Sequence, residues 1–394
     1  MANNVISENG VEYLVFLCYH PNCFKNTDKM IGEYFMIRIL STLSLLLTMF
    51  VLTACGASSS KSYELALITD VGTIDDKSFN QSAWEGMKAY AEEHDITYKY
   101  YQPTEKATSA FETAFDLAVE GGAKVIVCSG YLFEVAVYNA QTKYPDVKFI
   151  LLDGQPHDEN EDPTKVDYTI KDNVNAIFYA EEQSGFLAGY AAVKDGYKNL
   201  GFIGGMEAPA VIRYGYGFVQ GAEYAANEMG LDDVTVKYNY SGTFSASPEV
   251  QSMAASWYNQ GTEVIFACGG QIGNSIMTAA EATGGKVIGV DVDQSSESTS
   301  VITSATKQLS VSVKNAIDSY YNGSFAGGQV VTLDATSQAV GLPLKTSLFK
   351  QFNEADYNAI YEKIVSGEIT IKKNTDAKKV TDLSIERLSI TNIG

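Results

Sequence analysis

Three aspartates, Asp70, Asp153 and Asp291, each come just after a short apolar run of the chain. A carboxylate accepts hydrogen bonds from hydroxyl groups and ring N–H groups, so these residues suit a small polar ligand. Glycine pairs at 204–205 and 269–270 follow other apolar runs, and a backbone without side chains can approach a ligand closely. Each aspartate alone could equally cap the next helix, so the prediction depends on the repeated pattern.

An enzymatic interpretation has weaker support. Ser304 and Lys307 match the Ser-x-x-Lys pattern of penicillin-recognising serine enzymes, and the Lys-Thr-Ser of 345–347 distantly resembles their later Lys-Thr-Gly. The Ser-Asp-Asn triplet of those enzymes is missing between the two segments, and the chain contains no Gly-x-Ser-x-Gly or His-Glu-x-x-His motif. We therefore expect no catalytic residues, no metal site and no cofactor.

Two cysteines and one glycine-rich segment are also expected to have no catalytic role. Cys128 and Cys268 end apolar runs and are predicted to be inert thiols of the core. Residues 269–275 open a predicted helix, where an anion could bind, but they lack the Gly-Lys-Ser/Thr ending of a phosphate loop. We interpret this segment as a backbone cradle for sugar hydroxyls.

The elements that must position these residues follow from the hydrophobic pattern. From Leu65 onward, short apolar runs alternate with amphipathic stretches, which is typical of parallel sheets covered by helices on both faces. Predicted strands begin, in two similarly spaced series, near Leu65, Thr97, Lys124 and Val147, and near Asn199, Val234, Glu263 and Lys286. The pattern predicts two α/β halves, with ligand contacts in the loops at the carboxyl ends of the strands.

The segment 36–56 is an apolar run after Arg38 that ends in Leu-Thr-Ala-Cys at Cys55. The run is short for a membrane span and has a basic residue before it, which predicts an export signal. Its last four residues resemble a bacterial lipobox, whose cysteine receives a diacylglyceryl group. We predict a leader and signal peptide over 1–54, a lipid-anchored tether over 55–62, and a position on the extracytoplasmic side of the cell membrane.

The composition restricts the partners. The chain of 394 residues has 48 acidic and 28 basic side chains and a net charge of −20. Such a charge argues against nucleic acid and against electrostatic adhesion to anionic lipids, so the lipid would have to anchor the protein. Few cysteines remain after Cys55, which excludes a disulfide scaffold, and the length suits two domains.

One long motif carries a family resemblance. Residues 70–86 read Asp-Val-Gly-Thr-Ile-Asp-Asp-Lys-Ser-Phe-Asn-Gln-Ser-Ala-Trp-Glu-Gly. This segment resembles the signature of the basic membrane lipoprotein family, the purine nucleoside receptor type of ABC transporter substrate-binding protein. Supporting segments occur in the family's order at 184–190, 288–294 and 303–307. The similarity covers about 61–371.

The resemblance implies a fold. The expected class is α/β, a two-lobed type I periplasmic-binding-protein fold in which each lobe is a mainly parallel sheet flanked by helices and the lobes join at a hinge. The chain would enter the second lobe near Glu181, return near Ser298 and cross again near Val330. The expected lobes are therefore 63–180 plus 298–329 and 181–297 plus 330–394.

The resemblance also implies how a base would bind. The family clamps a purine between two aromatic rings, and the matching residues here are Phe79 and Phe244. A flat base between two rings buries apolar area without requiring one hydrogen-bond pattern. The base would also contact Asp153.

Other contacts are implied for the ribose. Asp70 and Asp291 can accept hydrogen bonds from vicinal hydroxyls, and Lys307 would balance their charge. Loop position adds four weaker candidates, which are Asn80, Ser129, Gly242 and Gly270. The loop 130–132 has no secure counterpart in the family pattern.

We therefore predict a monomeric, lipid-anchored receptor that captures nucleosides, with purine nucleosides expected, and delivers them to an ABC permease and its ATPase. Its mechanism would be lobe closure stabilised by the ligand, with no bond made or broken. Two alternatives remain, a ligand-sensing receptor ectodomain and a sugar-binding lipoprotein of the same fold. A sugar receptor would keep the aspartates but would not need two aromatic faces.

Overall fold

The computed structural model describes residues 7–8, 11–12, 62–70 and 72–392. The chain divides into two units, 1–60 and 61–394. In the first unit, β1 (Ser7–Glu8) pairs antiparallel with β2 (Val11–Glu12). The predicted signal segment, Cys55 and the tether up to residue 61 lie outside the described residues. Among the residues described, no helix combines the length and apolar character needed to cross a bilayer.

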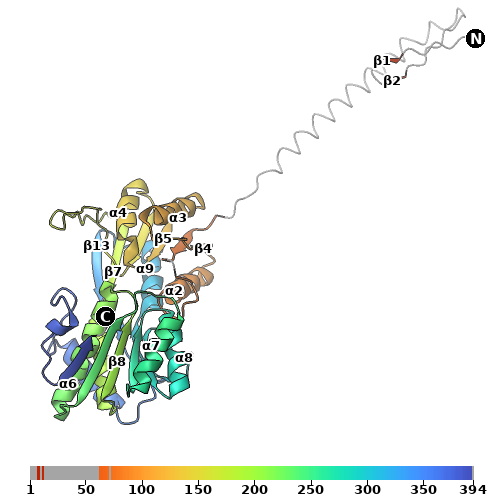
Figure 1. Ribbon diagram of the computed structural model, residues 1–394. Helices are drawn as coiled ribbons and strands as arrows, with labels where there is room; N and C mark the ends of the chain where they lie inside the picture. The colour runs from red at the N-terminus through yellow and green to blue at the C-terminus, as the bar shows by residue number, and fades with distance from the viewer. Residues whose placement is uncertain (1–6, 9–10, 13–61, 71, 393–394) are drawn as a thin grey trace, which may run out of the picture. The chain divides into compact units, whose positions relative to one another are not determined.

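The second unit contains two sheets, and the first is entirely parallel (Figure 1). Its strand order is β13-β7-β6-β5-β3-β4. The strands are β3 (Leu65–Ile68), β4 (Tyr98–Tyr101), β5 (Val125–Ser129), β6 (Lys148–Leu152), β7 (Val174–Tyr179) and β13 (Gln329–Leu333).

Helices cover both faces of the first sheet because β3 is apolar on both sides. Leu65 and Leu67 pack with α2 (Phe79–Glu93) and α9 (Leu309–Tyr321), whereas Ala66 and Ile68 pack with α3 (Thr108–Glu120) and α4 (Glu134–Lys143). A short 3-10 helix, η2 (Tyr131–Phe133), precedes α4.

The second sheet has the order β14-β12-β11-β10-β8-β9-β15, and only β14 pairs antiparallel. Its strands are β8 (Asn199–Gly204), β9 (Val234–Tyr240), β10 (Val264–Cys268), β11 (Lys286–Asp291), β12 (Val301–Lys307), β14 (Val340–Gly341) and β15 (Leu388–Asn392).

The helices of the second half also lie in two layers. One layer, α7 (Pro248–Asn259) and α8 (Ile272–Thr283), shares a core with Ile203 and Ile265 of the sheet. The other, α5 (Glu181–Lys194) and α6 (Pro209–Met229), packs with Phe202 and Phe266. The remaining helical elements are η3 (Ala335–Ser337), α10 (Glu354–Val365) and η4 (Val380–Asp382).

The eight predicted strand starts are confirmed to within one residue, but β7 and four later strands had no comparable prediction. Two of the unpredicted strands change where the chain passes between the sheets. The crossing predicted near Ser298 is wrong, because β12 pairs with β11 and keeps the chain in the second sheet as far as Lys307. The crossing predicted near Val330 is also early, because β13 pairs with β7 through Leu333.

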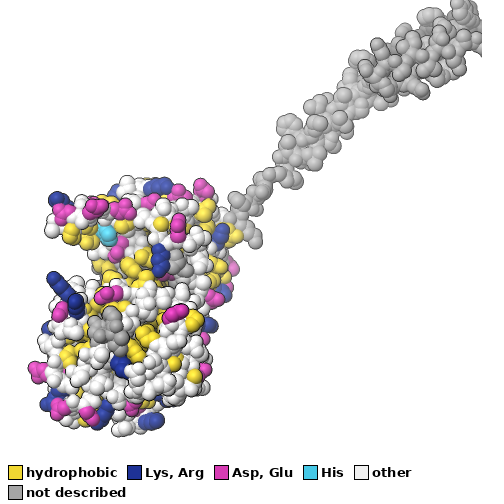
Figure 2. All heavy atoms as spheres, viewed as in Figure 1, with side chains coloured by type: hydrophobic (Ala, Val, Ile, Leu, Met, Phe, Trp, Pro, Cys, Tyr) yellow, Lys and Arg dark blue, Asp and Glu magenta, His cyan; other side chains and the backbone are white. Residues whose placement is uncertain are grey.

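The sheets therefore define two lobes with three connections between them. The first connection follows Tyr179, near the predicted Glu181, and the others follow Lys307 and Leu333. In the space-filling view, an indentation separates the two parts of this unit, and acidic side chains are spread over the visible face (Figure 2).

Candidate ligand-binding site

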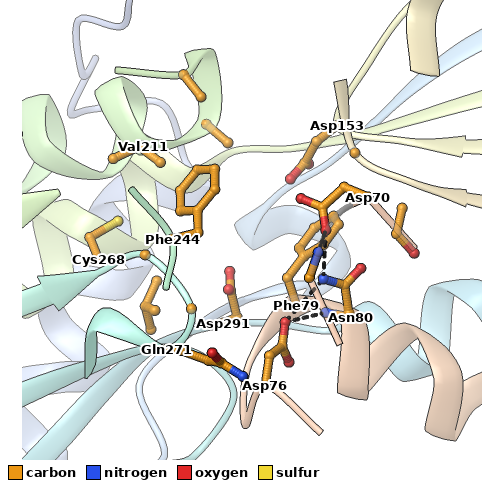
Figure 3. Close-up of a pocket in the computed structure, with 18 of the residues that line it drawn as sticks. Asp70, Asp76, Phe79, Asn80, Asp153, Val211, Phe244, Cys268, Gln271 and Asp291 are labelled. Atoms are coloured by element: carbon orange, nitrogen blue, oxygen red, sulfur yellow. Dashed lines mark hydrogen bonds between the residues drawn. The ribbon is translucent and has the colours of Figure 1, made fainter. Parts of the chain in front are cut away.

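A cavity of about 340 Å³ lies where the carboxyl ends of the two sets of strands face each other. This position agrees with the general rule for open α/β sheets. All nine predicted ligand residues line it, which are Asp70, Phe79, Asn80, Ser129, Asp153, Phe244, Gly270, Asp291 and Lys307. Figure 3 labels six of them, Asp70, Phe79, Asn80, Asp153, Phe244 and Asp291. Gly242, a weaker candidate, does not line the cavity but lies in the same loop as Phe244.

The lining divides into two walls. The first wall comes from the first sheet and α2 and contains Asp70, Phe79, Asn80, Ser129 and Asp153. The second wall comes from the second sheet, its loops and α6, and it contains Phe244, Gly270, Asp291 and Lys307, together with small or apolar side chains such as Val211 and Cys268.

Asp153 and Asp291 occupy corresponding places, since Asp153 directly follows β6 and Asp291 ends β11. Both have left-handed backbone conformations, with φ of 55° and 66°. This region costs an L-residue roughly 1–2 kcal/mol and is tolerated best by Gly, Asn and Asp. The strained turn at each strand end is consistent with a functional position.

Lys307, the last residue of β12, joins the two aspartates. Its Nζ atom lies 2.6 Å from Asp153 Oδ2, 3.0 Å from Glu181 Oε1 and 3.6 Å from Asp291 Oδ1. Burial alone would lower the pKa of Lys307, but the surrounding carboxylates raise it above its ordinary value. The lysine is therefore a permanent cation between the walls.

For Asp153, in contrast to Lys307, the effect of burial on the pKa outweighs the effect of the neighbouring charges. Burial raises the pKa of Asp153 to about 7, and the charge of Lys307 opposes that rise. Burial also raises the pKa of Asp70, whose Oδ1 atom accepts hydrogen bonds from Gly72 N at 2.6 Å and Asn80 Nδ2 at 3.1 Å.

Two half-buried phenylalanines lie on opposite sides of the cavity (Figure 3). Phe79 is the first residue of α2, and Lys307 Nζ lies 4.7 Å from its ring centroid, within cation–π range. Phe244 packs against Gly205, where a Cβ atom would come 2.3 Å from its ring. The glycine is therefore required for the position of the Phe244 ring.

Three buried polar atoms of the first wall have no hydrogen-bond partner among the described residues, namely Asn80 Oδ1, Ser129 Oγ and Asp153 Oδ1. Buried polar groups in folded proteins almost always have a hydrogen-bond partner. We therefore expect a bound molecule to supply the partners of these three atoms. The first wall thus offers hydrogen-bonding atoms beside an aromatic face.

Asp76 is a lining residue that the sequence interpretation missed. Its carboxylate accepts hydrogen bonds from the backbone N–H groups of Ser78, Asn80 and Gln81 at 2.9, 3.0 and 3.0 Å. Burial raises its pKa to about 6, against these hydrogen bonds. An aspartate just before a predicted helix start was the available signal. Lys106, Tyr131 and Tyr214 also line the cavity and had no such signal.

Hydrogen bonds tie the loops of the two lobes together, among them three close to the cavity. Ser78 Oγ donates to Asp291 Oδ2 at 2.5 Å. Nearby, Gln294 Nε2 donates to Lys77 O at 2.8 Å, and Gln271 Nε2 donates to Thr73 Oγ1 at 3.2 Å. The structure therefore has the two walls in contact around the cavity.

The competing motifs have structural explanations. Ser304 lies within β12 and its Oγ atom accepts a hydrogen bond from Gln294 N at 3.0 Å, so it does not line the cavity with Lys307. Cys128 and Cys268 are buried free thiols, as predicted, and burial raises the pKa of both.

Two facing α/β lobes with a cavity at their strand ends define a periplasmic-binding-protein-like solute-binding fold. The chain superposes on an ABC transporter solute-binding protein from Aeropyrum pernix K1 with a TM-score of 0.69 and 22% identity, covering 81% of this chain and 95% of that one. It superposes on another from Conexibacter woesei DSM 14684 with a TM-score of 0.61 and 20% identity, covering 79% and 99%. At these identities the likeness establishes the fold alone.

The chain belongs to the Bmp family, described as ABC transporter substrate-binding protein PnrA-like, whose profile matches residues 63–375. It is 29% identical over 343 residues to the ABC transporter nucleoside-binding protein BmpA of Lactococcus lactis subsp. cremoris, covering 81% of this chain and 92% of that protein. The family is one of binding proteins, not enzymes, and its members function with a ligand, a permease and an ATPase.

Proposed function

We propose that this protein captures purine nucleosides on the extracytoplasmic side of the membrane and delivers them to an ABC permease. The observation that carries the proposal is the pair of phenylalanines, Phe79 and Phe244, on opposite sides of one cavity. Two such faces suit a flat aromatic base, and base–aromatic stacking contributes roughly 1–3 kcal/mol per base. The nucleoside-binding relative from Lactococcus lactis supports the same ligand class.

The proposed pose puts the base between the rings and against Asp153, and the ribose against Asp70, Asp291 and Lys307. The unpartnered Oδ1 atom of Asp153 supports the base contact, since a base N–H group would complete its hydrogen bonding. Asn80, Ser129 and Gly270 would supply the remaining polar contacts.

We propose that binding closes the two lobes around the ligand. The connections after Tyr179, Lys307 and Leu333 would act as the hinge, and the hydrogen bonds between the walls, such as Ser78 to Asp291, would belong to the closed state. A ligand can favour closure only through contacts that the open state cannot make, which rings on opposite walls would provide.

The proposed location depends on the leader. Cleavage before Cys55 and its lipidation would leave the protein on the outer side of the membrane, monomeric and tethered by residues 55–62. Mass spectrometry of the protein from a bacterial host would test this step by the added mass of the lipid on Cys55. Unmodified Cys55 with an uncleaved leader would contradict it.

Isothermal titration calorimetry tests the ligand class. A soluble form, residues 57–394, would be unfolded and refolded to remove carried ligand and then titrated with guanosine, adenosine, inosine, cytidine and ribose. Residues 61–394 form one compact unit, so this form keeps both lobes. We expect tight binding of purine nucleosides and negligible binding of ribose. Tight ribose binding would move the assignment to the sugar-binding alternative, and no binding at all would favour the sensor alternative.

A further inference from the structure

A buried ion pair lies behind the cavity without lining it. Glu181 Oε2 is 2.6 Å from Arg213 Nε, and Glu181 Oε1 is 3.0 Å from Lys307 Nζ. The Glu181 side chain is 0% exposed and that of Arg213 is 9% exposed. A chain of charges therefore runs from Arg213 through Glu181 and Lys307 to Asp153, whose other oxygen is unpartnered.

The helices that carry this pair are packed at backbone contact. Glu181 begins α5, directly after the first connection between the lobes, and Arg213 lies on α6. A Cβ atom on Gly217 would lie 2.0 Å from Glu182 O, and one on Gly185 would lie 2.2 Å from Tyr214 O. Only glycine allows this approach, so α5 and α6 hold the two charged side chains together.

The charges of the group do not balance. Asp153, Glu181 and Asp291 surround Lys307, and Arg213 provides the second cation. With every group ionised, the set carries one excess negative charge in a buried place. Excess buried charge is costly, so one carboxyl must be easier to protonate than the others.

Geometry indicates which carboxyl this is. Glu181 has both oxygens paired with cations, and Asp291 has Ser78, Tyr214 and Lys307 as partners. Only Asp153 combines one paired oxygen with one unpartnered oxygen in the cavity wall.

We propose that Glu181 and Arg213 are positioning residues that set, together with Lys307, whether the free oxygen of Asp153 accepts or donates a hydrogen bond. An ionised Asp153 accepts from an N–H group at the edge of a base, whereas a protonated Asp153 can donate to a bare ring nitrogen. The hydrogen bond between Asp153 and a base rests on the proposed function. The electrostatic part of the proposal, the effect of Glu181 and Arg213 on the protonation of Asp153, does not.

The two members of the pair have opposite effects on Asp153. Burial raises the pKa of Asp153 to about 7, Lys307 and Arg213 lower it, and Glu181 raises it. The other titratable groups that face this cluster are Glu182, which interacts with Glu181 and Arg213, and Asp76, Tyr179, Tyr214 and Cys268. Removing the negative charge of Glu181 should therefore lower the pKa of Asp153, and removing the positive charge of Arg213 should raise it.

Titration of Asp153 in the ligand-free soluble form, residues 57–394, tests the electrostatic part. Carboxyl ¹³C NMR with ¹³C-labelled aspartate would follow its signal from pH 4 to 9, with assignment from Asp153→Asn. We expect the pKa of Asp153 to fall by about one pH unit or more in Glu181→Gln and to rise by a similar amount in Arg213→Gln. The double variant should return close to the parent value.

The controls separate charge from packing. Arg213→Lys keeps the charge and should leave the titration near that of the parent. Arg387→Gln removes an arginine paired with Asp232 on an exposed surface, far along the chain, and should not move the titration. Glu181→Gln and Arg213→Gln break the same ion pair. If the pair had a purely structural role, both variants would shift the pKa of Asp153 in the same direction or leave it unchanged. Either result would overturn the proposal. If Arg213→Gln does not fold, the result for Glu181→Gln alone tests the proposal. Loss of the negative charge of Glu181 lowers the pKa of Asp153 only if Glu181 acts electrostatically.

A second measurement separates this inference from the proposed function. The affinity for guanosine and adenosine would be measured against pH for the parent and both variants, and its midpoint should move with the Asp153 titration. A shifted titration without nucleoside binding would contradict the ligand assignment and leave the electrostatic inference standing. Nucleoside binding with an unshifted titration would contradict the inference alone.

Discussion

The two walls of the cavity differ in how far the protein satisfies its own polar groups. On the first wall, Asn80, Ser129 and Asp153 each keep a buried atom without a partner in the described structure. On the second wall, Asp291 uses both carboxylate oxygens within the protein, toward Ser78, Tyr214 and Lys307. The rest of the second wall combines apolar side chains such as Phe244, Val211 and Cys268 with polar ones such as Gln271, whose amide already donates to Thr73.

This difference suggests a division of labour. A wall with unpaired polar atoms can distinguish ligands by their hydrogen-bonding groups, because a ligand that fails to pair them leaves their desolvation uncompensated. An apolar wall contributes area and can accept many flat ligands. We therefore expect the first wall to distinguish one ligand from another. We expect the second wall mainly to supply the contact area that favours closure of the lobes.

The largest expected effect comes from removing the cation between the walls. Lys307→Met would leave Asp153, Glu181 and Asp291 as buried carboxyls around an apolar side chain. Breaking a buried charge group in this way costs about 3–5 kcal/mol, so urea denaturation should show a loss of that size, with nucleoside binding abolished.

A surface lysine provides the matched control for that variant. Lys314 pairs with Glu93, and both side chains are substantially exposed. Lys314→Met should change the free energy of unfolding by no more than about 1 kcal/mol. Equal stability of the two variants would show that Lys307 does not hold the walls together.

The aromatic faces should come next. Phe244→Ala should weaken guanosine binding by about 5- to 150-fold, from a loss of roughly 1–3 kcal/mol of stacking, and Phe79→Ala should do the same from the other wall. Calorimetry would measure both. Phe349→Ala, a half-buried phenylalanine that does not line the cavity, serves as the control and should leave affinity unchanged. An unchanged affinity in Phe244→Ala would remove the base-stacking assignment.

The two corresponding aspartates give the most direct comparison of the walls. Asp153→Asn should change the ranking of guanosine, inosine and adenosine, whereas Asp291→Asn should weaken all three alike, by about tenfold for a lost interaction of 1–2 kcal/mol. Asparagine tolerates the left-handed backbone at both positions. Asp293→Asn, at an exposed neighbouring position, is the control. If both variants altered the ranking equally, the proposed division of labour would be wrong.

The smallest effect concerns a carboxyl that belongs to neither wall. Burial raises the pKa of Glu182 to about 7 from an ordinary value of 4.5, and its Oε2 atom is unpartnered. The folded state keeps this proton between about pH 4.5 and 7 while the unfolded state has lost it, so the contribution of Glu182 to stability declines as pH rises through that window.

Thermal unfolding at pH 5 and pH 8 would measure this contribution. Glu182→Gln should reduce the fall in melting temperature between the two values by a few degrees. Asp116→Asn should not, because Lys143 and Tyr144 lower the pKa of that partly exposed carboxyl and it stays ionised at both pH values. A parallel fall in parent and Glu182→Gln would exclude Glu182 as the source.

Much of the fold could be predicted because its strands are locally encoded. Apolar runs such as the one at Leu65 have the length and pattern of strands buried on both faces, and all eight predicted starts agree with the structure. The strand β12 was missed because its sequence, Val301–Lys307, is mostly small and polar, and its register depends on β11 from another part of the chain. The connection predicted near Ser298 was misplaced for that reason, and the one predicted near Val330 was early because β13 pairs with the distant β7.

The candidate site shows the same distinction. Residue types in strand-end loops were sufficient to name the aspartates and the weaker polar and glycine candidates, since parallel strands bring their carboxyl ends to one edge. Phe79, Phe244 and Lys307 were named through the family resemblance of the motifs that contain or precede them. Asp76 carried a weaker signal, and nothing local linked Glu181 and Arg213 to the cavity.

The sequence alone therefore determined the two series of strands, the strand-end aspartates and the phenylalanine that opens α2. Tertiary structure decided which of those residues keep unpaired atoms and which charges surround Lys307. Hydrogen bonding and burial at Asp153 depend on groups far away in the chain, at Glu181, Arg213 and Lys307. Such electrostatic effects arise from distance and desolvation in the folded protein, and local sequence encodes neither.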